Sequence, residues 1–191
     1  MISSGSFPTK YSFTKNLVSD QTYVDIREIY TTASGAFDVS NGYGVGSGTS
    51  SVGFIVLAGG FADQTVTGVV RAVNTTDRLG IFGRATQTDS GTEYYYYANI
   101  DSGTARLSKY VNGTLTTMSS SAFTFAAATD VTIVLSCVGA SISATFTSSG
   151  VAQSPLTLSS AEDSNVPRRG TFGFRTHLKP GWCRSFTVAQ P

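Results

Sequence analysis

The sequence predicts an all-β protein with the antiparallel, two-sheet architecture of a β-sandwich. Three segments alternate apolar and polar residues with a period of two, which places successive side chains on opposite faces of a strand: 64–73, 132–137 and 141–147. Turn signals recur between such segments, and Asn112-Gly113 is a strong hairpin signal. No segment carries a convincing helical period, although residues 159–163 resemble the start of one helical turn.

The expected elements follow one another along the whole chain. Residues 1–30 are expected to form an N-terminal arm and a first strand, and residues 31–191 a β-sandwich domain. The arm's strand is expected at 22–29, where Val24 and Ile26 alternate with Asp25 and Arg27. Further strands are expected at 36–39, 52–58, 64–73, 79–85, 93–100, 104–110, 114–118, 122–126, 132–137, 141–147, 154–158, 170–175 and 183–189.

The alternation also predicts which residues form the core. Ile133 and Phe146 fall on the apolar sides of their strands, and Thr132 and Thr145 on the polar sides. Cys137 lies on the apolar side as well, where a free cysteine acts as a small hydrophobic residue. We interpret the chain's two cysteines as buried thiols, with a disulfide as the alternative.

Composition excludes several classes of function. The net charge is +1 and only 13% of residues are charged, which argues against a nucleic-acid partner because phosphate neutralisation supplies most of that affinity. The longest apolar run, residues 54–58, is too short for a membrane span, and no secretion signal is visible at the N-terminus. The lone His177 has no partner spacing that suits zinc, and no run of acidic residues suits calcium, so no metal or cofactor is expected.

A family resemblance rests on the order of the strands and on their glycine and aromatic positions. Residues 68–71, 78–84, 95–100, 105–110 and 170–175 resemble the concanavalin A-like lectin/glucanase superfamily, in its laminin-G-like branch. The resemblance covers roughly residues 36–190 and implies a jelly roll of two curved antiparallel sheets. It further implies that a ligand would lie on the concave face or on the loops at its rim.

Catalysis is not expected. Glycosidases of this superfamily carry closely spaced carboxylates, and no such run occurs here. Glu93 and Asp101 lie at opposite ends of one predicted strand, while the adjacent Glu162 and Asp163 would point apart on an extended chain. We therefore expect no catalytic residues.

The tyrosine run 94–97 is the best candidate for binding. Alternation places Tyr95, Tyr97 and Asn99 on one face, where aromatic rings with hydroxyl groups suit sugars and protein partners alike. Arg84 and Arg71 are expected to join this ligand surface from neighbouring strands. The alternative is that the tyrosines stiffen the sheet through cross-strand contacts.

These observations predict a non-enzymatic binding and assembly protein. We favour a structural component of a tailed-phage virion, such as a decoration, fibre or tail-associated protein, whose partners are other virion proteins or further copies of itself. The aromatic residues Phe7, Tyr11 and Phe13 of the arm would then contact a neighbouring chain. The alternative is a free, extracellular carbohydrate-binding module or lectin that binds cell-surface glycans, and a glycoside hydrolase is a distant third.

Overall fold

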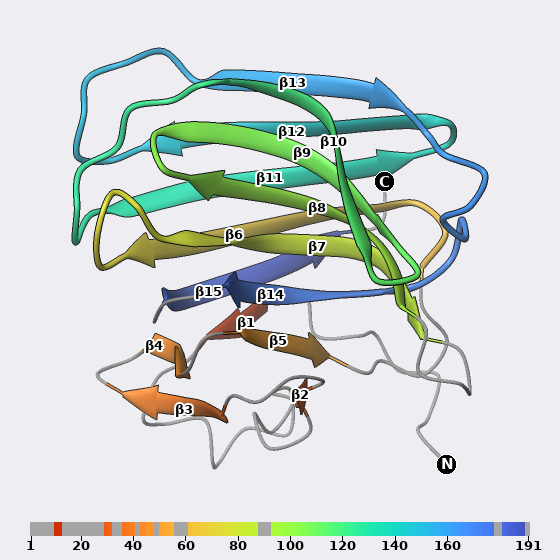
Figure 1. Ribbon diagram of the computed structural model, residues 1–191, viewed down its shortest axis with the longest axis horizontal. Coiled ribbons are helices and arrows are strands. Elements are labelled where there is room, and N and C mark those ends of the chain that lie inside the picture. The colour runs from red at the N-terminus through yellow and green to blue at the C-terminus, as the bar shows by residue number, and fades with distance from the viewer. Residues whose placement is uncertain are drawn as a thin grey trace.

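The computed structural model of the protein describes residues 10–12, 29–31, 36–40, 43–47, 50–55, 61–87, 93–177 and 181–189. These residues form two packed antiparallel sheets with no helix among them, which confirms the predicted all-β jelly-roll sandwich (Figure 1). In this part of the chain there is accordingly no helix long and apolar enough to span a membrane.

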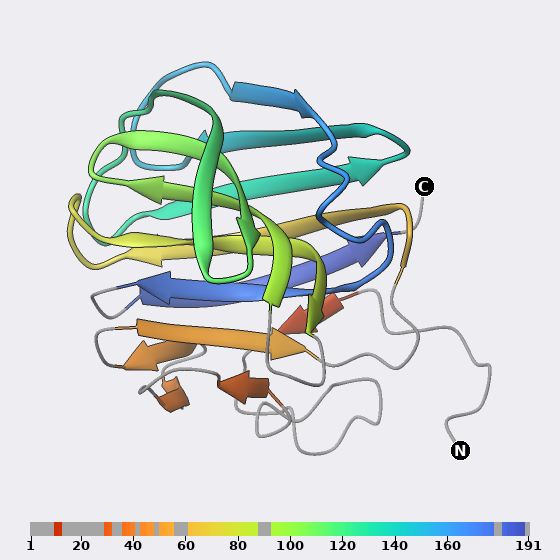
Figure 2. The same ribbon diagram turned by 45° about the vertical axis from the view of Figure 1, so that its right-hand side comes forward.

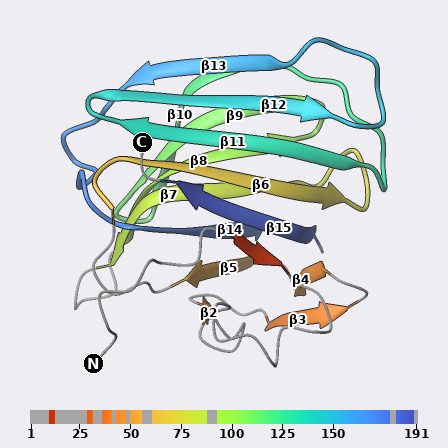
Figure 3. The same ribbon diagram turned by 180° about the vertical axis from the view of Figure 1, so that it is seen from behind.

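The first sheet contains eight strands and is seen from its outer side in Figure 3. Its order is β13 (Leu156–Ala161), β12 (Ser141–Ser148), β11 (Asp130–Val138), β6 (Gln64–Ala72), β15 (Gly181–Ala189), β4 (Tyr43–Ser47) and β3 (Ala36–Ser40), and β1 (Lys10–Ser12) pairs with β15. Because β15 lies between β6 and β4, the last strand of the fold occupies the interior of the sheet.

The second sheet contains seven strands. Its order is β10 (Thr114–Ala122), β9 (Thr104–Val111), β8 (Glu93–Asp101), β7 (Arg78–Gln87), β14 (Thr171–His177), β5 (Ser50–Ile55) and β2 (Ile29–Thr31). Strands β8, β9 and β10 curl strongly along their length (Figure 2). They form a meander joined by two tight turns, in which Ser102-Gly103 and Asn112-Gly113 all have positive φ, as hairpin turns of this length require. The hairpin predicted at Asn112-Gly113 is confirmed.

The main hydrophobic core lies between the two sheets, and the predicted faces are confirmed. Ile133 and Phe146 are fully buried, whereas Thr132 and Thr145 are partly exposed on the opposite face of their strands. The second sheet contributes the alternate residues Tyr96, Ala98 and Ile100 of β8, which are also fully buried. Cys137 and Cys183 are buried and not bonded to each other, so the thiol interpretation is confirmed.

Some sequence-based expectations were wrong, and others concern residues that lie outside the described ranges. Residues 159–163 do not begin a helical turn, because β13 continues through Ala161 as a partner of β12. Residues 122–126 are not a separate strand: β10 extends to Ala122 and ends there. Phe7 and Phe13 lie outside the described residues. Tyr11 lies in β1, where it is the register partner of Phe186 within the same chain.

Candidate ligand-binding face

The candidate site is the outer face of the second sheet, meaning the side of β7, β8, β9 and β14 that points away from the main core. On β8 this face carries Tyr95, Tyr97, Asn99 and Asp101, because the alternate residues point into the core. The sequence-based expectation that one face of the tyrosine strand belongs to the core is therefore confirmed. From Tyr95 to Asp101 along β8, the outer face changes from aromatic to polar to charged.

The aromatic end is a small second core. Phe82, Ala85, Tyr95 and Tyr97 are buried together, and Tyr110 of β9 and Leu115 of β10 pack against them. The Tyr95 and Tyr110 rings stack with centroids 4.7 Å apart, and the Phe82 ring lies 5.2 Å from Tyr95. Such ring pairs add stability beyond the area that they bury. These strands are therefore held together on both of their faces.

Arg175 reaches from β14 across this aromatic cluster. Its guanidinium carbon lies 5.9 Å, 5.7 Å and 5.2 Å from the ring centroids of Tyr95, Tyr97 and Tyr110, which is cation–π range. Its Nη1 donates to the Tyr95 hydroxyl, and the Tyr97 hydroxyl donates to the Arg175 carbonyl at 3.2 Å. Burial raises the pKa of both Tyr95 and Tyr97 above the ordinary value, although the Arg175 charge acts in the opposite direction. Both phenols therefore remain neutral, with the Tyr95 hydroxyl as an acceptor and the Tyr97 hydroxyl as a donor.

This geometry corrects one expectation about the tyrosines. Tyr95 and Tyr97 are fully buried and do not form an exposed aromatic platform. The packing corresponds instead to the alternative reading, in which tyrosines stiffen the sheet through cross-strand contacts. A direct contact between these two rings and a ligand remains a prediction.

The middle of the outer face carries polar atoms without partners. Asn99 Oδ1, Ser108 Oγ and Arg175 Nε are buried and form no hydrogen bond with any described residue; Arg106 Nε forms none either, although it lies 3.4 Å from Asp101 Oδ2 in an ion pair. Asn99 is the register partner of Arg106 on β9, and Ser108 lies two residues further along that strand. Buried polar groups are normally satisfied, and leaving one unpaired costs about 1–3 kcal/mol. Several such atoms on one face therefore mark a place where a polar ligand would recover free energy.

The charged end is built around Asp101. Arg78 Nη2 lies 2.7 Å from Asp101 Oδ2, and Arg106 Nε lies 3.4 Å from the same oxygen. The Ser102 hydroxyl donates to Asp101 Oδ1 at 3.2 Å. The Arg78 and Arg106 side chains are about one third exposed, at 32% and 34%, so this end of the face is open to solvent.

Sequence reasoning identified Asn99 but missed Arg106, Ser108 and Arg175. A signal for two of them was present in the sequence. The Ser102-Gly103 turn joins the predicted strands 93–100 and 104–110 as a hairpin, and alternation from that turn places Arg106 and Ser108 beside Asn99 and Tyr97. Arg175 could not be found in this way, because its strand pairs with β7 and β5 and not with β8.

Arg84 does not join this face, contrary to expectation. At β7 two residues, Arg84 and Ala85, stand opposite the single residue Tyr95, which is a β-bulge, and Arg84 has φ of 50°. The bulge breaks the alternation, so Ala85 packs on the outer face while Arg84 points toward the loops of the other sheet.

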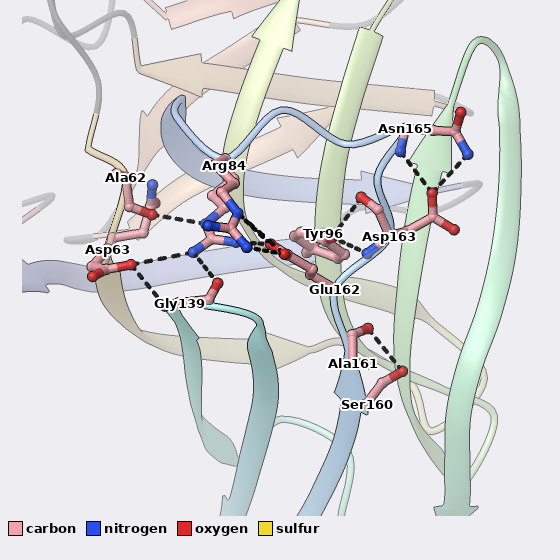
Figure 4. Close-up of polar contacts among 12 residues, drawn as sticks. Ala62, Asp63, Arg84, Tyr96, Gly139, Ser160, Ala161, Glu162, Asp163 and Asn165 are labelled. Atoms are coloured by element: carbon pink, nitrogen blue, oxygen red, sulfur yellow. Dashed lines mark hydrogen bonds and ion pairs between the residues drawn. The ribbon is translucent and has the colours of Figure 1, made fainter.

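The Arg84 guanidinium is only 1% exposed and is surrounded by acceptors from three loops (Figure 4). It donates to the carbonyl oxygens of Ala62 at 2.8 Å and Gly139 at 2.9 Å. It also lies 3.3 Å from an Asp63 carboxylate oxygen and 3.5 Å from one of Glu162. With its donors engaged within the protein, Arg84 is a structural residue.

Arg71 does not join the face either. It lies on β6 in the first sheet, which is not a neighbour of β8, and its Nε lies 2.7 Å from Asp130 Oδ1. Arg184 Nη1 lies 3.0 Å from the other oxygen of the same carboxylate. The predicted ligand surface is thus divided between different faces of the sandwich, and only Tyr95, Tyr97 and Asn99 remain together.

The acidic residues that could be considered for catalysis are engaged elsewhere. Glu162 is hydrogen-bonded to Arg168, which lowers its pKa, and Lys109 and Asn165 lower the pKa of Asp163 to about 2. The Tyr96 hydroxyl also accepts a hydrogen bond from the Asp163 backbone N–H at 2.7 Å (Figure 4). Across the described ranges, no cluster of His, Cys, Asp and Glu suits a metal ion.

The architecture is similar to that of several solved structures, although no sequence match was found. No family model and no curated protein sequence matches the chain. Among solved structures, the carbohydrate-binding module CBM66 from Bacillus subtilis is similar, with a TM-score of 0.65 and 14% identity over 85% of this chain and 96% of that chain. The protein has a lectin-like jelly-roll fold.

Two further structures illustrate the range of proteins with this fold. A Bacillus subtilis protein of unknown function with a galectin-like fold has a TM-score of 0.63 and 14% identity, over 94% of this chain and 96% of that chain. A Bacteroides ovatus protein, Xyloglucan PUL GH43B, has a TM-score of 0.61 and 14% identity, over 96% of this chain but only 39% of that chain. These likenesses extend to the concanavalin A-like fold that the sequence predicted, and not to a particular ligand.

Proposed function

We propose that the protein is a non-enzymatic saccharide-binding module whose ligand binds the outer face of the second sheet at Asn99, Arg106 and Ser108. One observation carries the proposal: the polar middle of this face holds buried side-chain atoms without hydrogen-bond partners in the described structure. Similar structures add support, since they include a carbohydrate-binding module and a lectin complexed with galactose.

The unpaired atoms have the chemistry that sugar hydroxyls require. Asn99 Oδ1 accepts a hydrogen bond from a hydroxyl, Arg106 Nε donates one, and the Ser108 hydroxyl does either. The ligand approaches past Arg106, which is partly exposed and stands directly across from the buried Asn99. Because Asn99 and Ser108 are buried, the proposal requires the Arg106 side chain to move aside when the sugar binds.

The competing functions have less support. Glu93 and Asp101 lie at opposite ends of β8, eight residues and therefore roughly 26 Å apart along the strand. A glycosidase needs its two carboxylates within about 5–10 Å. Nothing in the similar structures indicates a virion protein, and they include a carbohydrate-binding module, so the sequence-based preference for a phage particle gives way to its alternative, the carbohydrate-binding module.

The test pairs glycan binding with stability. Ser108→Ala and Asn99→Leu each remove an unpaired polar atom while keeping much of the side-chain volume. We expect each variant to lose at least about tenfold in affinity for the glycan selected on an array, measured by calorimetry, because one hydrogen bond in a buried site is worth this much. Neither variant should be less stable to urea, since an apolar side chain relieves the unpaired group.

Ser136→Ala is the matched control. Ser136 lies on the outer face of the first sheet, away from the candidate site, and its hydroxyl is 3.3 Å from that of Thr65. This variant should bind the glycan as the parent protein does. Unchanged affinity in Ser108→Ala and Asn99→Leu, or the absence of any glycan ligand, would refute the proposal.

A further inference from the structure

We infer that the saccharide carries a carboxylate, as a uronic acid does, and that Arg106 binds this group beside the ion pair of Arg78 and Asp101. The inference rests on the proposed function and specifies its ligand. It is carried by an excess of guanidinium groups over carboxylates at the charged end of the outer face.

The charged end of the outer face has an excess of positive charge among its described residues. One oxygen of Asp101 faces both guanidinium groups, at 2.7 Å from Arg78 Nη2 and 3.4 Å from Arg106 Nε. A single negative charge thus stands against two positive charges. Glu93 lies at the far end of β8, and Lys109 points to the opposite face of its strand, where it pairs with Asp163. Among the described residues, the open end of the outer face therefore carries a net positive charge.

Arg106 has N–H donors available for an anionic ligand. Arg78 is engaged, because its Nε donates to Asp101 at 2.9 Å and its Nη2 lies against the same oxygen. Arg106 forms no hydrogen bond with another described residue, and its ion pair at 3.4 Å is the longer of the two. A guanidinium offers five N–H donors in a planar fork that matches a carboxylate. Arg106 therefore has a free fork for a second carboxylate, at a position that solvent reaches.

The spacing of Arg106, Asn99 and Ser108 suits a sugar ring that carries a carboxylate. Asn99 lies across from Arg106 on the neighbouring strand, where facing side chains are about 5 Å apart, and Ser108 lies two residues along β9, about 7 Å away. A carboxylate attached to a sugar ring and bound at Arg106 places the ring hydroxyls over Asn99 and Ser108. Gly80 lies between Asn99 and Arg175 in the register, and a Cβ there would lie 2.0 Å from the Ala98 carbonyl oxygen and 2.7 Å from Asn99 Cβ, so the glycine lets β7 and β8 approach closely beside Asn99.

The experiment compares an acidic oligosaccharide with its neutral counterpart. The probes are tetragalacturonate and the same tetrasaccharide after reduction of its carboxyl groups, titrated calorimetrically into the full chain. We expect the acidic probe to bind at least about tenfold more tightly, as one charge-assisted bidentate pair would provide. Its affinity should fall as salt is added, because the arginines are partly exposed.

Two variants locate the effect. Arg106→Gln should weaken the binding of tetragalacturonate about tenfold more than the binding of the reduced probe, because glutamine keeps an N–H donor for a sugar hydroxyl but cannot form the charged bidentate pair. Arg184→Gln is the control, since Arg184 is 59% exposed on the first sheet, and it should bind as the parent does. Circular dichroism confirms that each variant is folded.

The outcomes separate the inference from the proposed function. If the reduced probe binds as tightly as the acid, or if Arg106→Gln weakens the binding of both probes equally, the carboxylate assignment is wrong while saccharide binding stands. The carboxylate assignment is also wrong, and saccharide binding again stands, if neither probe binds but an array yields a neutral glycan whose affinity depends on Ser108 and Asn99. If no glycan of either kind binds, both the inference and the proposed function fail.

Discussion

Replacing Arg84 with methionine tests whether one buried guanidinium holds three loops together. The change keeps a long apolar stem but removes the charge and every donor. Hydrogen bonds from Nε to the Ala62 carbonyl at 2.8 Å and from Nη2 to the Gly139 carbonyl at 2.9 Å are then lost. Hydrogen bonds to charged groups contribute about 1.5–3 kcal/mol each, so these two together are worth about 3–6 kcal/mol.

The two carboxylates beside Arg84 add little to this free energy. Asp63 is half exposed and 3.3 Å away, and Glu162 is 3.5 Å away, so solvent screens both pairs. Methionine also fits poorly at φ of 50°, as arginine does, and this strain is common to both proteins. We therefore expect Arg84→Met to lower the free energy of unfolding by about 3–5 kcal/mol, in the range found when one partner of a buried ion pair is removed.

The assay is urea unfolding followed by circular dichroism, with Arg168→Met as the control. Arg168 binds the same Glu162 carboxylate but is 64% exposed, so its loss should leave the unfolding midpoint almost unchanged. A loss of less than about 1 kcal/mol in Arg84→Met would refute the reasoning, because the loops would then be held by other contacts.

Three further predictions follow from burial and charge. Phe146→Ala and Ile133→Ala should each cost about 2–5 kcal/mol in urea unfolding, whereas Thr132→Ala and Thr145→Ala should cost less than about 1 kcal/mol; equal losses would contradict the assigned faces. Burial raises the pKa of the Cys137 thiol to about 12, and Cys183 is buried too, so a thiol reagent at pH 8 should label neither in the native protein and both after unfolding. Any rapid labelling of the native protein would show an open route to the core. The pKa of Asp163 is held at about 2 by Lys109 and Asn165, so its stabilising contribution is present above about pH 4 and is lost as the pH falls toward 2. Between pH 5 and pH 2.5 the urea midpoint should therefore fall further in the parent than in Asp163→Asn, and an equal fall would count against this assignment.

The sequence predicted the faces of the strands well, because a period of two is a local property. It could not predict the burial of Tyr95 and Tyr97. Alternation gives the side of the sheet on which a residue lies, but not what packs over that side. Here the covering groups include Tyr110 from the next strand and Arg175 from a strand about 80 residues away in the sequence.

Arg84 and Arg71 show two other limits of sequence reasoning. The orientation of Arg84 depends on a bulge, which shifts the alternation by one residue and leaves no reliable mark in the sequence. The position of Arg71 depends on which sheet β6 joins, and that is decided by its long-range pairing with β11 and β15. The expected C-terminal ends of β10 and β13 were too early for a related reason. Pairing with β9 and β12 extends each strand beyond the segment that alternates.

The position of β14 and β15 in the interior of the two sheets has a consequence for synthesis of the protein. β6 ends at Ala72 and the strand that covers its open edge begins at Gly181. At about 5–20 residues per second, a ribosome needs roughly 5 to 20 s to make the intervening chain. During that interval the nascent polypeptide exposes an unpaired strand edge, which is a template for aggregation. Deletion of β15 would accordingly remove an interior strand and not an edge strand, so β6 and β4 would no longer be connected within the sheet.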